Sequence, residues 1–95
     1  MVVGVCHLDL SIKESNSLKG KRRILKSVIT RVKNKFNVSI AEVGHHDLWQ
    51  SAQIGFSIVG NDKRFINSSL DKVIHFIEEL NSADIINSEI DLLNY

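Results

Sequence analysis

Apolar and polar side chains alternate along the first segment of the chain. Over residues 2–12, Cys6, Leu8 and Leu10 fall on one side and His7 on the other. Successive side chains of a strand point to opposite faces, so this alternation predicts a half-buried β-strand. Three later runs also predict strands: residues 38–43, residues 51–60, and residues 85–93 with Ile86, Ile90 and Leu92 on one face.

Two longer segments have apolar residues at helical spacing instead. Residues 18–36 carry one apolar stripe, and residues 63–80 carry another at nearly ideal i, i+4, i+7 intervals. Such stripes are typical of amphipathic helices packed on a core. A polar break, KESNS, precedes the first helix, and the turn Gly60–Asp62 places an N-cap before the second. The stripes consist of Leu18, Leu25, Val28, Ile29, Val32 and Phe36, and of Ile66, Leu70, Val73, Ile77 and Leu80.

The order of these elements is βαββαβ, the same strand–helix–strand unit twice. Crossover connections between strands are right-handed in nearly all proteins, which leaves few topologies open. We expect an α+β, ferredoxin-like fold with an antiparallel sheet in the order 4-1-3-2 and both helices on one face. The chain has 95 residues, which suits one domain spanning residues 1–95.

Composition adds limits on the cellular setting. Hydrophobic residues make up 43% and charged residues 24%, which is ordinary for a globular protein. The single cysteine, Cys6, excludes an internal disulfide framework and favours a reducing compartment. The first residues, MVVGVCHLDL, lack the basic start of a signal peptide and are interrupted by His7 and Asp9. We expect a cytoplasmic protein without a membrane partner.

Charge is divided unevenly along the chain. From Ser15 to Ala41 there are eight lysines or arginines and no acid, whereas Phe65 to Tyr95 holds six acids and one lysine. Cations at a helix N-terminus oppose the helix dipole, so their presence favours an anion there, and a longer basic surface favours a polyanion. A solvated basic face that balances the acidic half is the alternative. The candidate nucleic-acid or anion-binding residues are Lys19, Lys21, Arg22, Arg23 and Lys26.

The predicted open face of the sheet has a different character. RNA-recognition modules stack bases on aromatic side chains of such a face, and none occurs here. Its small and apolar residues, such as Val3, Val5 and Val59, would instead allow close approach of a second copy. A homodimeric protein-interaction module is therefore an alternative to nucleic-acid binding.

The segment GHHDLWQ, Gly44–Gln50, holds two adjacent histidines and the only tryptophan. Adjacent side chains of extended backbone diverge, and a zinc site needs three or four ligands, so we expect no metal. The chain has no nucleophile elbow, no P-loop and no second domain to form a pocket, so we expect no cofactor and no catalytic residue. A small phosphoester hydrolase using the histidines as acid and base is the less favoured reading. We interpret the segment as a turn, with Gly44 at positive φ, and as a contact loop formed by His45, His46, Asp47, Trp49 and Gln50.

Three stretches, MVVGV, SLKGKRRILKS and FNVSIAEVGHHDLWQSAQIGFSIVGND, resemble the YlxP-like family of small bacterial proteins, a domain of unknown function. The resemblance covers nearly the whole chain. It implies the ferredoxin-like fold and no established activity, cofactor or catalytic residue. Genes of the family often lie among genes for translation initiation and ribosome maturation, which implies a link to the ribosome by association.

These observations together predict a non-enzymatic accessory protein with ribosomal particles or structured RNA as its partner. The basic first helix would contact the phosphate backbone, and the GHHDLWQ segment would form the rim of the contact surface.

Overall fold

All six predicted elements occur in the computed structural model, which describes residues 1–95. Every boundary lies within one residue of its expected position. The elements are β1 (Val2–Ser11), α1 (Leu18–Lys35), β2 (Ser39–Gly44), β3 (Ser51–Gly60), α2 (Lys63–Glu79) and β4 (Asp84–Asn94).

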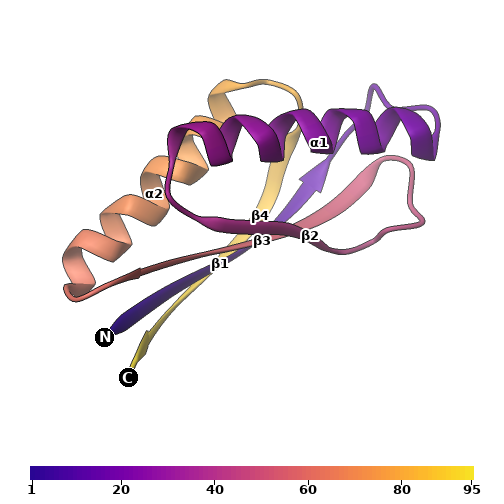
Figure 1. The fold of residues 1–95 in the computed structure, drawn as a ribbon. Coiled ribbons are helices and arrows are strands. Elements are labelled where there is room, and N and C mark those ends of the chain that lie inside the picture. The colour runs from indigo at the N-terminus through magenta and orange to yellow at the C-terminus, as the bar shows by residue number, and fades with distance from the viewer.

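The sheet has the predicted topology. Its strands lie in the order β2-β3-β1-β4, and each neighbouring pair is antiparallel. Both helices cover the same face, with α1 and α2 crossing it side by side and the other face left open (Figure 1). This arrangement is the ferredoxin-like fold. It brings the end of β1, the start of α1 and the β2–β3 connection to one end of the molecule.

The core lies between the sheet and the two helices. Each central strand buries alternate residues, as the period of two requires. On α2 the four buried residues are four of the five in the predicted stripe, and on α1 the stripe is buried at Leu25, Val28 and Val32. Neither helix combines the length and apolar character needed to cross a membrane.

Both helices begin at the polar residues that the sequence indicates. The Ser17 hydroxyl accepts a hydrogen bond from the Gly20 amide at 2.9 Å. The Asp62 carboxylate accepts from the Arg64 amide at 2.8 Å. Such caps satisfy amides that have no partner inside the helix, and each stabilises its helix by about 1 kcal/mol.

The last strand departs from the expected pattern. Leu10 pairs with Ile85 and Asp9 pairs with Asn87, so Ile86 is an extra residue in β4. A bulge of this kind shifts the alternation by one position. Ile85 therefore packs against the core, whereas Ile86 is 68% exposed. The prediction that Ile86 shares a face with Ile90 and Leu92 by simple alternation is wrong for this reason.

Cys6 lies on β1 with no exposed surface. Burial, and next the Asp71 carboxylate, raise the pKa of its thiol from 9.0 to about 11. In the unfolded chain the thiol loses its proton above about pH 9, whereas the folded chain keeps it up to about pH 11. Unfolding therefore releases a proton in this window, and stability falls as the pH rises.

We expect wild type to lose about 2 kcal/mol of unfolding free energy between pH 8 and pH 11 through this thiol alone. Urea unfolding of wild type and Cys6→Ala at both pH values isolates the effect, because the other titrating groups are shared. Equal pH dependence in the two proteins would contradict the assignment.

Candidate nucleic-acid interface

Four of the five basic residues predicted to bind an anion, Lys19, Arg22, Arg23 and Lys26, are exposed on α1. At 100° per residue they lie on one side of the helix, and Lys33 falls on the same side. We call these five exposed residues the basic stripe: Lys19, Arg22, Arg23, Lys26 and Lys33. From Lys19 to Lys33 the stripe spans about 21 Å at 1.5 Å per residue.

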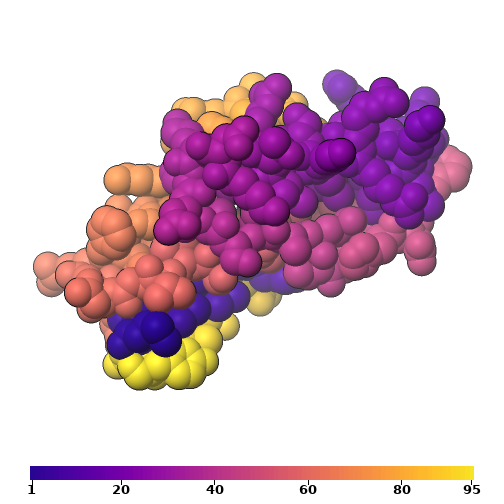
Figure 2. All heavy atoms as spheres, in the orientation of Figure 1, coloured from indigo at the N-terminus to yellow at the C-terminus, as the bar shows by residue number.

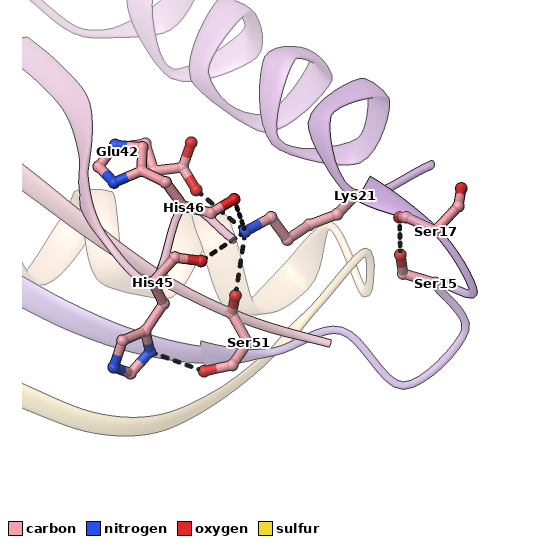
Figure 3. A network of polar contacts seen from close by, with 7 residues as sticks. All are labelled: Ser15, Ser17, Lys21, Glu42, His45, His46 and Ser51. Atoms are coloured by element: carbon pink, nitrogen blue, oxygen red, sulfur yellow. Dashed lines mark hydrogen bonds and ion pairs between the residues drawn. The ribbon is translucent and has the colours of Figure 1, made fainter. Parts of the chain in front are cut away.

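Lys21, the fifth predicted residue, has no exposed surface. Its ammonium group points from α1 to the β2–β3 connection (Figure 3). The Nζ atom donates to the carbonyl oxygens of His45 at 2.7 Å, His46 at 3.3 Å and Ser51 at 3.3 Å. The prediction that Lys21 lies on the basic surface is wrong, because this side chain fixes the loop to the helix.

Glu42 on β2 completes the environment of Lys21. Its Oε2 lies 3.3 Å from Nζ, and the side chain is 19% exposed. Oε2 is buried and makes no hydrogen bond, whereas Nζ donates to three carbonyl groups. Glu42 therefore pairs with Lys21 by charge alone. No acidic side chain lies within 4.0 Å of a cation of the basic stripe.

A shallow groove follows the stripe between α1 and β2. Its volume is about 380 Å³. The helix and strand lie side by side on the face shown in the space-filling view (Figure 2). Cations dominate the charge of the groove, since Glu42 is already paired. The lining residues are Arg22, Leu25, Lys26, Ile29, Thr30, Lys33 and Glu42.

The helix start itself is less open to an anion than the sequence suggests. Ser17 already accepts from the Gly20 amide, and the Lys21 amide donates to the Ser17 carbonyl at 3.0 Å. The Ser15 hydroxyl also points inward, donating to the Ser17 carbonyl at 2.9 Å (Figure 3). The capped backbone of the helix start therefore offers little to an anion, and the exposed cations of the basic stripe are the groups available for binding.

The GHHDLWQ segment forms the predicted turn, but with a different backbone. His45 has φ of 57°, and no glycine of the chain has positive φ. Gly44 instead provides room, because a Cβ there would overlap Gln53 Oε1. The turn closes where the Leu48 amide donates to the His45 carbonyl at 3.1 Å. The prediction of positive φ at Gly44 is therefore wrong. The left-handed conformation occurs at His45, whose carbonyl oxygen accepts a hydrogen bond from Lys21.

The two imidazole rings point in different directions (Figure 3), although the backbone at His45 is left-handed and not extended as predicted from the sequence. His45 Nδ1 lies 2.9 Å from the Ser51 hydroxyl. The structure contains no group of three or more His, Cys, Asp and Glu side chains placed to hold a metal ion.

Gln50 and Trp49 have opposite roles in the contact loop. The Gln50 amide donates to the Lys13 carbonyl at 3.1 Å and to the Ser15 carbonyl at 3.0 Å, so its NH₂ group is already used within the chain. Trp49 is 56% exposed, and its neighbour Leu48 is 48% exposed. Sequence reasoning missed Leu48, since a leucine is ordinarily assigned to the core.

The open face of the sheet carries a group of apolar residues at one end. Val3 pairs with Val59 and Leu93, which are 62% and 42% exposed. Farther along β1 the face is polar, and Asp9 accepts a hydrogen bond from Gln53 at 2.9 Å. The homodimer through this face stays a prediction.

Comparisons with known proteins agree with this architecture. A solved structure titled "De novo designed protein Foldit4" matches with a TM-score of 0.55 over 100% of this chain and 99% of its own, at 16% identity. That likeness concerns the fold alone. The "Uncharacterized protein YlxP" of Bacillus subtilis (strain 168) is 39% identical over 77 residues, which are 81% of this chain and 84% of that protein. The family model "Protein of unknown function (DUF503)" matches residues 3–90. The chain therefore belongs to the DUF503 family, to which the resemblance to YlxP-like proteins pointed.

Proposed function

We propose that this protein is a non-enzymatic accessory factor that binds structured RNA, such as that of ribosomal particles, through the basic stripe of α1. The observation that carries the proposal is the absence of acidic partners around that stripe. Cations without protein partners keep their full attraction for phosphate, and the counterions they displace from RNA favour binding.

The shape of the surface favours a polyanion over a small phosphate. The five cations are spread over about 21 Å of one helix side, so they cannot converge on a single phosphate group. A nucleic-acid backbone presents phosphates in series, which matches a row of cations. The groove of about 380 Å³ beside the stripe is shallow enough to follow such a backbone.

Binding without chemistry fits the same residues. Glu42, the single acid of the groove, is held by Lys21 and has little exposed surface. A general acid or base must reach the proton that it transfers, and the two loop imidazoles point in different directions. The side chains along the groove thus serve to hold an anion.

Cosedimentation with purified ribosomal particles tests the proposal. We expect wild type to pellet at low salt and to remain in solution at moderate salt. Arg22→Glu combined with Lys26→Glu should pellet poorly even at low salt. Quantitative binding should show a salt slope reduced by about two, one unit for each lost phosphate contact.

A matched control separates local contact from net charge. Lys63→Glu combined with Arg64→Glu changes the charge by the same amount at exposed positions of α2. This variant should pellet like wild type. If wild type fails to pellet at low salt, or if both double variants lose binding equally, the basic stripe is not the binding surface.

A further inference from the structure

Trp49 is a large apolar side chain held in solvent by a fixed loop. It is 56% exposed, and its indole N–H has no hydrogen-bond partner in the chain. Burying a side chain of this size would stabilise the protein by about 2 kcal/mol or more. Trp49 nevertheless stays exposed, although hydrogen bonds hold the backbone before and after it in place.

The loop is fixed from two directions. From α1, Lys21 Nζ binds carbonyl groups on both sides of the tryptophan, those of His46 and Ser51. From the connection before α1, the Ile12 amide donates to the Gln50 carbonyl at 2.9 Å, and the Gln50 side chain donates back to that connection. Trp49 is therefore presented at a defined position relative to the start of the basic stripe.

A shallow, open hollow of about 450 Å³ lies at the indole and is lined by Leu48, Trp49, Gln50 and Ser51. Leu48 and Trp49 give it apolar surface, and Gln50 and Ser51 give it polar surface. The Gln50 amide nitrogen is used in the chain, whereas its Oε1 accepts no hydrogen bond within it. An exposed aromatic side chain with apolar and polar neighbours suits a flat, partly polar ring system.

We infer that Trp49 is a stacking platform for one unpaired nucleotide base, in an RNA whose adjoining backbone lies along the basic stripe. This inference rests on the proposed function and names its substrate class: structured RNA with an unpaired base beside the bound backbone. Stacking on an aromatic side chain needs an unstacked base and tolerates any base identity. The basic stripe contacts phosphates, which paired and unpaired RNA share. A preference for RNA with an unpaired base would therefore come from Trp49.

Two short RNAs test the inference: a blunt-ended duplex, and the same duplex with one unpaired nucleotide. Fluorescence anisotropy of labelled RNA gives the affinity of each for wild type, Trp49→Ala and Trp49→Phe. We expect Trp49→Ala to weaken binding of the RNA with the unpaired base about 5- to 100-fold and to change duplex binding less than about twofold. Trp49→Phe should keep most of the preference, and only the RNA with the unpaired base should quench wild-type tryptophan fluorescence.

The outcomes separate the inference from the proposed function. If Arg22→Glu with Lys26→Glu weakens both RNAs but Trp49→Ala affects them equally or not at all, the stacking site is wrong and the basic stripe stands. If wild type binds neither RNA at low salt, the proposed function fails and the stacking site fails with it. Because Trp49 is exposed, circular dichroism should show the variants folded as wild type.

Discussion

Replacing Lys21 by methionine should lower the free energy of unfolding by about 3–5 kcal/mol. Methionine keeps the apolar stem of the side chain but removes the ammonium group. Three carbonyl groups then lose their donor, and Glu42 keeps a largely buried charge without a partner. Leaving a buried charge unpaired is among the most destabilising single changes in a protein.

Urea unfolding followed by circular dichroism measures this effect. Lys19→Met is the matched control, because Lys19 is exposed on the same helix, and it should change stability by less than about 0.5 kcal/mol. Adding Glu42→Gln to Lys21→Met should recover part of the loss by removing the orphaned charge. Equal stability of the two methionine variants would contradict the buried position of Lys21.

Gly4→Val should destabilise the protein by about 3 kcal/mol. A Cβ at Gly4 would overlap Ile66 Cγ2 and lie 2.9 Å from Leu70 Cδ1, because α2 packs directly on this position of β1. Gly4 does not have positive φ, so the effect comes from space and not from the backbone. Pushing α2 away from the sheet would loosen the contact between the two layers.

Gly55→Val provides the comparison on the opposite face. A Cβ at Gly55 would lie 3.2 Å from Val43 Cγ1, and Val43 is 50% exposed and free to move. We expect this variant to differ from wild type by less than about 1 kcal/mol. Thermal unfolding of both variants measures the two losses of stability. An equally large loss for Gly55→Val would show that a side chain at either position destabilises the protein whatever its neighbours.

Patterning predicts this fold well because most of its elements follow one period throughout. The buried side of β1 and the stripe of α2 were found by counting intervals of two and of three to four residues. The bulge at Ile86 could not be found by counting, because a bulge depends on how β4 is aligned with β1 and not on the residues of β4 alone. The backbone at His45 was missed for a similar reason. Gly44 looked the easier residue for positive φ, but the left-handed conformation falls on His45, whose carbonyl oxygen accepts a hydrogen bond from Lys21.

Lys21 was the main error in the candidate site, although a signal for it was present. It lies four residues before Leu25 and seven before Val28, which puts it on the buried side of α1. Grouping it with its basic neighbours ignored this spacing. Its carbonyl partners come from a loop more than twenty positions away in the sequence, so no local pattern could reveal them.

The most direct test of the central claim is to map RNA binding residue by residue. Amide proton–nitrogen correlation spectra of the labelled protein should be recorded while structured RNA with an unpaired nucleotide is added at low salt. We predict that the largest shifts occur along α1 between Lys19 and Lys33 and at Leu48–Gln50, and that they fade as salt is raised. Shifts centred on the open sheet face around Val3, Val59 and Leu93, or no shifts at all, would contradict RNA binding through α1.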